Sequence, residues 1–465
     1  MGGSIFKLCR MIQDDEILIP CGYQCKIIEY NGSIYCFETI GLNVLKISKE
    51  IMILLRDFRG TTLERIKCDF DNYVEIIESV NTLKEKGYFN NTHTEATHCV
   101  PSVSKIVVQV TTACNYRCSY CYNQTDKDKC GDKFLAKEKV DDILLFIKRN
   151  IRNKEVEISF FGGEPLLNFE IIKYYINKAG EIGIKCKYTL TTNGSLLTDE
   201  ISVYLKEKDF QVAVSIDFPE LIHNKYRISS YDNSFEYAIK GAYKLRNIMS
   251  KGFVINSVLS NDYPYPEKIV EAFLSADIVD KLSLSIVSDK AGLNSDECDQ
   301  IIEGDDKVLS NILKYKYPDG FNYLSFSSFI KSFIKRKTKC YRCGAGMEMI
   351  AIDTDGLIYP CHRFYSCNDS LMGNIYSGLD NEQIKIYQNN NVDNNETCVS
   401  CWARYVCGGP CMHDSYEYSG FISTPNECKC KRIKYLIKSA IILYGELIQN
   451  DPDRLVKMMR KYNKI

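Results

Sequence analysis

Three cysteines, Cys114, Cys118 and Cys121, stand close together, separated by gaps of three and two residues. They follow an apolar, β-branched run that breaks at Ala113, which predicts a strand leading into a loop. Three thiolates at this spacing could hold one iron-sulfur cluster, and a four-iron cluster would then keep one iron without a protein ligand. Such an iron has a free coordination site, at which a reaction could take place. Structural zinc is the alternative, but it needs a fourth ligand, and no other Cys or His lies at motif spacing. Loop cysteines without a cofactor are the remaining possibility.

The composition limits the class of protein in which this site can occur. The chain has 465 residues, enough for two or three domains with cores. Its formal net charge is -1, from 59 basic and 60 acidic residues, so we expect no nucleic-acid partner and no anionic membrane. The start lacks an apolar signal core, and no apolar run reaches about 18 to 20 residues, so we expect no membrane span. Free thiols among the 22 cysteines predict the reducing cytoplasm of an anaerobe.

Residues 1–98 predict a small winged-helix-like unit with a linker. Runs at 24–30 and 33–39 are joined by Asn31-Gly32, which is typical of a tight hairpin turn. Two helices and a short final strand should follow. The helical spacing is carried by Ile47, Ile51, Leu54 and Leu55, then by Val74, Ile77, Val80 and Leu83, with the end at Gly87 and the strand at Tyr88 and Phe89. Residues 92–104 read as a linker. Cys21 and Cys25 could be a metal pair, although ordinary thiols are favoured.

Strand and helix patterns alternate through residues 105–290. The strand-like runs are 105–111, 156–161, 186–192, 211–217, 253–259 and 281–287, and the clearest helical patterns are 140–151, 171–182 and 235–249. Such alternation predicts a parallel sheet with crossover helices. Reactive groups should then lie at the carboxyl ends of the strands.

Polar motifs lie at or near the carboxyl ends of three of these runs. Gly162-Gly163-Glu164 comes after the second run, Thr192-Asn193 ends the third, and Ser215 lies within the fourth. Glycines let the backbone approach a ligand, and a carboxylate can take an ammonium group. Each motif alone could be an ordinary turn.

The last segment is rich in cysteine. Its ten cysteines are Cys340, Cys343, Cys361, Cys367, Cys398, Cys401, Cys407, Cys411, Cys428 and Cys430. Two four-iron clusters need eight ligands if fully coordinated, so at least two of these cysteines are spare. A pair of zinc ribbons is the alternative, because zinc also accepts CxxC pairs. His362, next to Cys361, could shuttle a proton or could be structural.

The spacing Cys114-xxx-Cys118-xx-Cys121 resembles the signature of the radical SAM enzymes, and Gly162-Gly163-Glu164 and Thr191-Thr192-Asn193-Gly194 match further family motifs. The resemblance implies a partial (β/α)6 barrel. It also implies a four-iron cluster whose open iron chelates S-adenosylmethionine, with Tyr120 on the adenine. By resemblance, Glu164 meets the methionyl amine, and Thr192, Asn193 and Ser215 contact the ribose and carboxylate. Family members usually carry Gly after Asp217, whereas this chain has Phe218. His223 and Arg227 also fit a family pattern.

The cysteine order of residues 331–465 resembles the SPASM extension, which holds two auxiliary four-iron clusters. By resemblance, Cys340, Cys343, Cys361 and Cys411 hold the first. Cys398, Cys401 and Cys407 hold the second, with Cys428 or Cys430 as the fourth ligand, of which we expect Cys428. The barrel would cover residues 99–330.

Taken together, the chain resembles a radical SAM peptide maturase of the SPASM type. The N-terminal layout is similar to the peptide-recognition domain of such maturases, which binds a precursor's leader by adding a strand to a sheet edge. The implied reaction is hydrogen abstraction by the 5'-deoxyadenosyl radical, followed by thioether formation in a Cys-rich peptide. Flavodoxin or ferredoxin would be the electron donor.

Other functions stay open at this point. Within the same enzyme class, formylglycine formation on a sulfatase and carbon-carbon cross-linking of a peptide are possible. A non-catalytic iron-sulfur electron carrier is possible too, but it would leave the glycine and threonine motifs unexplained. A DNA-binding regulator is disfavoured because the chain has no basic excess.

Overall fold

The structure is a computed structural model that describes residues 24–85, 88, 102–123, 131–230, 232–249, 252–287, 294–365 and 367–460. Six parallel strands form the centre of its largest sheet, each beside the next in chain order. They are β4 (Lys105–Thr111), β6 (Val156–Gly162), β7 (Cys186–Thr192), β8 (Gln211–Ser215), β10 (Phe253–Leu259) and β11 (Lys281–Ile286).

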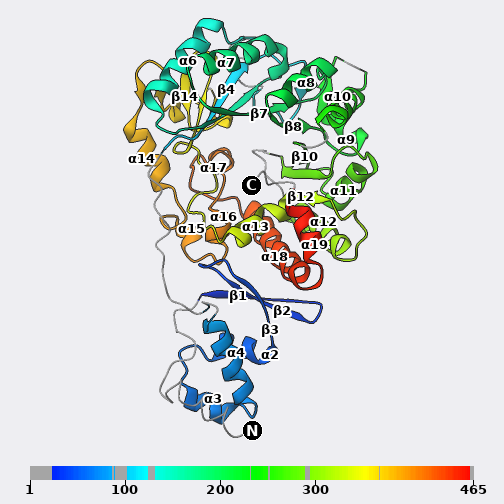
Figure 1. Cartoon of the computed structure of the whole chain (residues 1–465), viewed down its shortest axis with the longest axis vertical. Coiled ribbons are helices and arrows are strands. Elements are labelled where there is room, and N and C mark those ends of the chain that lie inside the picture. The colour runs from blue at the N-terminus through cyan, green and yellow to red at the C-terminus, as the bar shows by residue number, and fades with distance from the viewer. Residues whose placement is uncertain are drawn as a thin grey trace.

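Helices connect these strands and cover the outside of the curved sheet (Figure 1). They are α6 (Lys137–Asn150), α7 (Phe169–Glu181), α8 (Asp199–Glu207), α9 (Glu220–Tyr226), α10 (Ser234–Met249), α11 (Pro266–Ser275) and α12 (Ser295–Leu313). The predicted strands and helices match the observed ones to within a few residues. The predicted partial (β/α)6 barrel is therefore confirmed.

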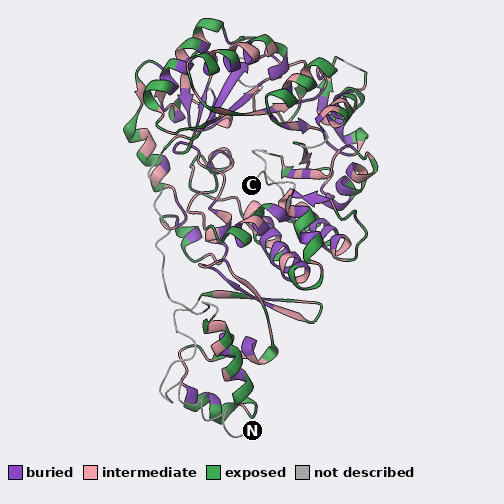
Figure 2. Cartoon of the chain, in the orientation of Figure 1, coloured by how far each residue is buried: buried purple, intermediate pink, exposed green. Residues whose placement is uncertain are grey.

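Parallel strands joined by crossover helices can be covered on both faces, and β4 shows this most clearly. In β4, every residue from Ile106 to Thr111 is buried, as a strand between a packed interior and a helical layer requires. Figure 2 shows the buried strands inside a shell of helices that are exposed on their outer sides. All six strands start at one edge of the sheet, so their carboxyl ends gather at the other edge.

The sheet continues beyond the barrel on both sides. Next to β11 lies β12 (Asn322–Tyr323), which leads into α13 (Leu324–Lys335). On the other side β13 (Met349–Ile352) pairs in parallel with β4, followed by the antiparallel β14 (Leu357–Tyr359), β15 (Gly373–Asn374) and β16 (Gly378–Leu379). The cysteine-rich segment therefore grows from the barrel's own sheet. The predicted boundary near residue 330 falls inside α13, and the division into three domains stays a prediction.

The remaining helices carry four of the ten late cysteines, and the other six lie in the turns between elements. They are α14 (Asn381–Asn389), α15 (Glu396–Val399), α16 (Arg404–Cys407), α17 (Met412–Ser419), α18 (Glu427–Asn450) and α19 (Pro452–Arg460). The apolar residues of 433–447 lie in the central part of α18.

In its described residues, the N-terminal unit is a three-stranded sheet with three helices. Its elements are β1 (Cys25–Tyr30), β2 (Ser33–Glu38), β3 (Val44–Ile47), α2 (Lys49–Asp57), α3 (Leu63–Asp69) and α4 (Tyr73–Glu85). The predicted hairpin is present, with φ of 45° at Asn31 and 78° at Gly32.

Two features of this unit differ from the prediction. Ile47 ends β3 instead of beginning a helix, because Ser48 caps α2 by accepting a hydrogen bond from the Ile51 amide. Val74 is 41% exposed, and Ile76 takes the buried place expected for it. Neither β3 nor α3 was predicted. Gly87, Phe89, Cys21 and most of the linker at 92–104 lie outside the described residues.

The strand β2 joins this unit to the rest of the molecule. Side chains of a strand alternate between two faces, and Cys36 faces the small core made with α2 and α4. Tyr35 and Phe37 face the opposite way and belong to the main core. Phe37 packs on Trp402 with ring centroids 6.1 Å apart. Among the described residues, no helix has the length and apolar character needed to cross a membrane.

Candidate functional site

The three clustered cysteines lie in the loop that follows β4. A two-stranded ribbon shapes this loop, because β5 (Tyr116–Cys118) pairs antiparallel with β9 (Arg227–Ser229) and places Cys118 opposite Arg227. The Cys121 amide donates to the Cys118 carbonyl at 3.0 Å. The Cys114 sulfur accepts a hydrogen bond from the Tyr116 amide at 3.4 Å. The fold therefore brings the predicted ligands together in one turn.

The electrostatics of these thiols fit a metal cluster. Burial, together with the charges of Glu164, Cys118 and Cys121, raises the pKa of Cys114 to about 12. Burial likewise raises the pKa of Cys118 to about 11. Three neighbouring buried thiolates repel one another unless a cation compensates them, which a bound iron-sulfur cluster would do.

The glycine pair has a steric reason. A Cβ on Gly162 would collide with the Thr111 carbonyl, and one on Gly163 would collide with the Ala113 carbonyl. The amides of Gly163 and Glu164 donate to these same two carbonyls, at 2.9 and 2.8 Å. The glycines let the end of β6 lie directly against the start of the cysteine loop. The expected approach to a ligand is therefore not needed to explain them.

Glu164 links the ends of two strands. It is 1% exposed, and its carboxylate accepts from the Thr192 hydroxyl at 2.7 Å, the Asn193 amide at 2.7 Å and the Leu166 amide at 3.2 Å. Burial raises the pKa of Glu164 to about 7, against the effect of these donors. The structure thus gives Glu164 a structural role, in addition to the contact with the methionyl amine that the resemblance implies.

Asn193 connects the cysteine loop to β7. Its side-chain nitrogen Nδ2 donates to Asn115 Oδ1 at 2.8 Å, and the side chain of Asn115 donates to the Ser195 hydroxyl at 2.8 Å. Ser195 donates back to Asn193 at 2.7 Å. Sequence reasoning missed Asn115, and its place between two ligand cysteines was the available signal. Ser215 lies half-buried at the end of β8, in register with Asn256 of β10.

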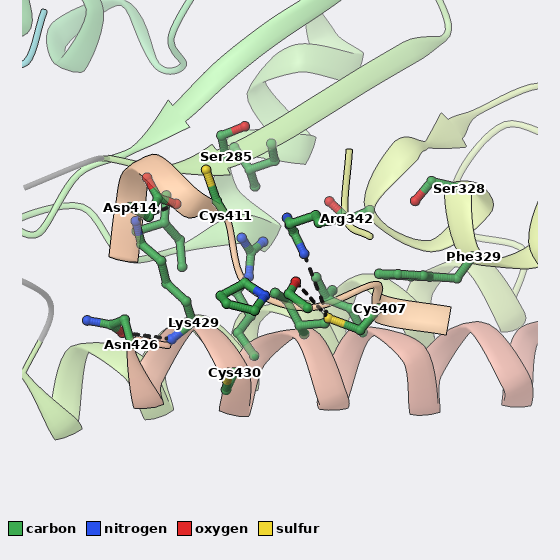
Figure 3. Close-up of a pocket in the computed structure, with 18 of the residues that line it drawn as sticks. Ser285, Ser328, Phe329, Arg342, Cys407, Cys411, Asp414, Asn426, Lys429 and Cys430 are labelled. Atoms are coloured by element: carbon green, nitrogen blue, oxygen red, sulfur yellow. Dashed lines mark hydrogen bonds and ion pairs between the residues drawn. The ribbon is translucent and has the colours of Figure 1, made fainter. Parts of the chain in front are cut away.

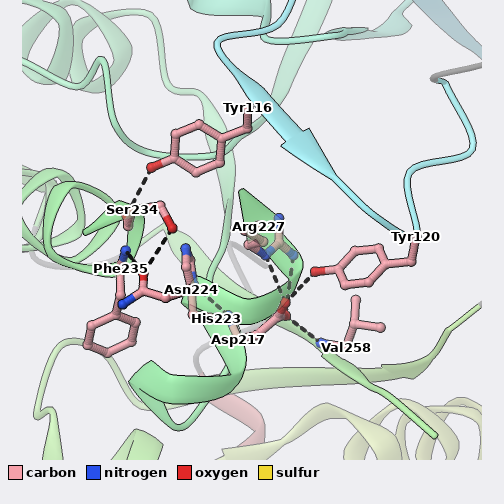
Figure 4. A network of polar contacts seen from close by, with 9 residues as sticks. All are labelled: Tyr116, Tyr120, Asp217, His223, Asn224, Arg227, Ser234, Phe235 and Val258. Atoms are coloured by element: carbon pink, nitrogen blue, oxygen red, sulfur yellow. Dashed lines mark hydrogen bonds and ion pairs between the residues drawn. The ribbon is translucent and has the colours of Figure 1, made fainter. Parts of the chain in front are cut away.

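A buried ion pair supports Tyr120. Asp217 is 1% exposed and accepts from Arg227 Nε at 2.9 Å, from the Val258 amide at 2.9 Å and from the Tyr120 hydroxyl (Figure 4). The Arg227 guanidinium lies 5.5 Å from the centre of the Tyr120 ring, and its charge lowers the pKa of Cys118 against the effect of burial. The network holds the ring of Tyr120 and the strand of Cys118 in fixed positions.

His223 completes this network as a structural residue. Its Nδ1 accepts from the Asp217 amide at 3.1 Å, and its ring packs edge-on against Phe235 with centroids 5.4 Å apart. Burial lowers the pKa of His223 to about 3, so the imidazole is neutral at ordinary pH.

Three of the late cysteines form a first group. Cys343, Cys361 and Cys411 come from different elements, yet the charges of Cys343 and Cys411 both raise the pKa of Cys361, which burial raises most, to about 12. Arg363 Nη1 lies 3.6 Å from the Cys411 sulfur. Cys340, the predicted fourth ligand, is half-buried, and its carbonyl accepts from the Val392 amide at 3.0 Å.

A second group contains Cys398, Cys401, Cys407 and Cys430. Burial, together with the charges of the other three, raises the pKa of Cys398 to about 12. Cys428, the expected fourth ligand, lies elsewhere: its thiol contacts Cys298 of α12, whose sulfur lies 3.5 Å from the Cys428 carbonyl. Two residues along a helix point about 200° apart, so α18 can present only one of the two cysteines to the group. Of the two candidates for a fourth ligand, the geometry therefore favours Cys430.

Aromatic residues fill the space between the barrel site and the first group. His362 packs on Phe161 with ring centroids 4.4 Å apart and on Tyr122 at 5.9 Å. Burial raises the pKa of Tyr122 most, and the charges of Cys121 and Cys361 both contribute in the same direction, so its hydroxyl lies near both sites. Burial lowers the pKa of His362 to about 3, which makes it a weak base. Its buried Nδ1 has no hydrogen-bond partner among the described residues.

A cavity of about 570 Å³ opens beside both cysteine groups (Figure 3). Its walls come from β11, the start of α13, the cysteine-rich segment and α18. They include Ser283, Ser285, Phe329, Arg342, Cys407 and Cys411. The size is within the usual range of sites for small ligands or peptide side chains.

The comparisons with known proteins agree with this geometry. Residues 108–286 match the family model described as the Radical SAM superfamily, so the chain contains a radical SAM domain. The match begins in β4 and ends with β11, and so it covers the cysteine loop and all six barrel strands.

Relatives extend the likeness beyond the barrel. The chain is 24% identical to the radical SAM cyclopropyl synthase TigE of Paramaledivibacter caminithermalis, over 95% of this chain and 99% of that protein. It is 24% identical to the cysteine-type anaerobic sulfatase-maturating enzyme of Clostridium perfringens, over 69% and 92%.

Solved structures share the fold. anSMEcpe with bound AdoMet has a TM-score of 0.64 at 20% identity, and the match covers 78% of this chain and 99% of that one. Streptococcus suis SuiB bound to S-adenosylmethionine has a TM-score of 0.51 at 16% identity, with coverage of 90% and 99%.

Proposed function

We propose that the protein is a radical SAM enzyme that modifies a ribosomally made, Cys-rich peptide. The observation that carries the proposal is the arrangement of three cysteine groups around one region of the fold. Cys114, Cys118 and Cys121 form one group at the end of β4, and Tyr122 lies between it and the first late group. Relatives named as a cyclopropyl synthase and a sulfatase-maturating enzyme support a maturase activity.

The three groups fit iron-sulfur clusters by their donor sets. The barrel group offers three thiols, which leaves one iron of a four-iron cluster for S-adenosylmethionine. The first late group would use Cys343, Cys361 and Cys411 with Cys340, and the second Cys398, Cys401, Cys407 and Cys430. When bound and reduced, the barrel cluster would supply the electron for reductive cleavage of S-adenosylmethionine.

The protein's own residues position these groups and exclude water. Tyr120 would pack on the adenine, with its hydroxyl fixed by Asp217 so that the ring keeps one orientation. Glu164, Thr192 and Asn193 hold the ends of β6 and β7 together. Ser215, on the neighbouring strand, remains a candidate contact to the cofactor. The chain thus supplies orientation, while the cofactor supplies the reactive species.

The proposed substrate is a peptide held by its leader at the N-terminal unit. In the described sheet of this unit β2 is central, so β1 and β3 are edge strands that an extended peptide could extend. The structure of anSMEcpe with bound AdoMet and the Kp18Cys peptide, at a TM-score of 0.61, supports a peptide substrate for this fold. A flavodoxin or ferredoxin is the proposed reductant.

Thioether formation is the proposed reaction. One C–H and one S–H bond of the peptide are replaced by one C–S bond, which is a two-electron oxidation. One electron leaves with the hydrogen that the adenosyl fragment takes, the other passes to an auxiliary cluster, and the thiol proton goes to solvent. Carbon-carbon bond formation is the second candidate, because TigE, similar over nearly the whole chain, is named a cyclopropyl synthase.

A mass experiment separates these reactions. The probe is the peptide encoded by the short Cys-rich reading frame nearest the gene, incubated anaerobically with reconstituted enzyme, dithionite and S-adenosylmethionine. A thioether removes two hydrogens and one alkylatable thiol per link. A carbon-carbon bond removes two hydrogens and leaves every thiol. A peptide of unchanged mass, in a reaction that still yields 5'-deoxyadenosine, would contradict the assignment of this peptide as substrate.

A further inference from the structure

Arg342 lies between the two late cysteine groups. It stands one residue before Cys343 of the first group, and its Nη1 lies 3.9 Å from the sulfur of Cys407 in the second. Figure 3 shows the guanidinium pointing to that sulfur from the wall of the cavity. The charge of Arg342 also lowers the pKa of Cys343 and of Cys430, against the effect of burial. A single cation therefore acts on both groups.

The other cations of this cavity have carboxylate partners. Arg363 pairs with Asp414 at 2.6 Å, and Lys429 shares Asp414 at 3.0 Å. Arg432 pairs with Asp305 at 2.8 Å. Within the described part of the chain, Arg342 has no such ion pair, and the Cys407 sulfur is its hydrogen-bond acceptor. Its charge is thus available to whatever negative charge the cysteines carry.

Iron-sulfur clusters would carry that charge. A four-iron cluster held by four thiolates becomes more negative on reduction, so a nearby guanidinium stabilises the reduced form. Hydrogen bonds to the sulfur ligands act in the same direction. Since Arg363 is neutralised by Asp414, its charge should affect the potential of the first group less.

We propose that Arg342 sets the reduction potential of the auxiliary cluster at Cys398, Cys401, Cys407 and Cys430, and keeps it high enough to accept an electron from the substrate. The inference rests on the proposed iron-sulfur content of this group. In this step the cluster gains one electron from the substrate, and no bond to the cluster forms or breaks. Arg342 acts through the cluster, so it is a positioning residue and touches no reacting atom.

The test is a redox titration of the anaerobic holoprotein followed by electron paramagnetic resonance. The Cys118→Ala chain, which should lack the barrel cluster, assigns the remaining signals to the auxiliary clusters. In Arg342→Gln we expect the ratio of reduced to oxidised cluster in the second group to fall about tenfold. This ratio is measured at a fixed ambient potential near the midpoint of the unmutated chain. For a one-electron couple this tenfold change is about 59 mV. Arg342→Lys keeps the charge and should shift less, and Arg342→Glu should shift more.

The matched control is Arg404→Gln. Arg404 belongs to the same segment and donates to the Val399 carbonyl and the Tyr405 hydroxyl, with no sulfur contact among its described bonds. It should leave the potential nearly unchanged. An unchanged midpoint in Arg342→Gln, or an equal shift in Arg404→Gln, would overturn the proposal while iron content stays complete. Absence of iron from the unmutated chain would instead contradict the proposed function.

Discussion

The barrel site and the cysteine-rich segment hold their thiols in different ways. The barrel site takes three cysteines from one loop, and backbone bonds from β6 and the buried Asp217–Arg227 pair fix that loop. The cysteine-rich segment collects its thiols from distant turns and short helices such as α15 and α16, each four residues long. We therefore expect the first geometry to depend little on a metal, and the second to depend on one more strongly to join its parts. This difference can be tested residue by residue.

The largest effect should come from the second late group. In Cys430→Ser we expect loss of one cluster, about four iron atoms per chain, with protease cleavage appearing within residues 398–430. Cys428→Ser is the matched control and should keep its iron, because that thiol faces Cys298. Iron analysis and limited proteolysis of the reconstituted proteins give the answer. The reverse result, with iron lost only in Cys428→Ser, would reject the geometry described for α18.

In the barrel site, the buried ion pair should dominate stability. Asp217→Ala leaves Arg227, which is 7% exposed, without its carboxylate, and should lower the free energy of unfolding by about 3–5 kcal/mol. The control is Glu155→Ala, which removes an exposed pair with Lys187 and should cost less than about 1 kcal/mol. Anaerobic chemical denaturation measures both. Equal losses in the two variants would mean that the pair does not support the loop.

Glu164 predicts a pH dependence. Because its pKa is about 7 in the folded chain and near 4.5 in the unfolded one, the folded chain keeps a proton between these values, and stability falls as pH rises through that window. The Gln side chain of Glu164→Gln does not ionise, so the stability of that variant lacks this pH dependence. The stability of the unmutated chain relative to Glu164→Gln should therefore fall by about 2 kcal/mol between about pH 5.5 and 7.5. A flat difference would show that the carboxylate ionises normally in the fold.

The smallest effect should come from Tyr120→Phe. The change removes the hydrogen bond to Asp217 and keeps the ring, so we expect a loss of about 1.5 kcal/mol in the free energy of unfolding. Tyr174→Phe removes an exposed hydrogen bond to Asp141 and should leave stability unchanged. Thermal denaturation of the two variants decides the matter. A larger loss in Tyr174→Phe would contradict the supporting role of the buried network.

The barrel could be predicted because its signals are local. Alternating strand and helix patterns gave β4, β7 and β10 with their observed bounds, and the spacing of Cys114, Cys118 and Cys121 defined the site. The short strand β3 carries too few residues to show a period. The boundary at Ile47 depended on a cap by Ser48 that competes with the apolar spacing.

Long-range contacts explain what the sequence left open. The steric reason for Gly162 and Gly163 lies in the cysteine loop, some fifty residues earlier in the chain, and no local pattern reveals it. The choice between Cys428 and Cys430 depends on which face α18 turns toward Cys398, which the spacing alone does not determine. Arg342 was missed because an arginine between two cysteines gives no motif signal. Its role depends on the approach of Cys407.

The most direct measurement is the cleavage of S-adenosylmethionine by the anaerobically reconstituted protein with dithionite and no peptide. The account predicts 5'-deoxyadenosine from the unmutated chain and none from Cys118→Ala, while Cys430→Ser, whose barrel site is intact, still forms it. Formation of 5'-deoxyadenosine by Cys118→Ala, or a reconstituted protein that contains zinc and no sulfide, would contradict the assignment of the three thiols at the end of β4.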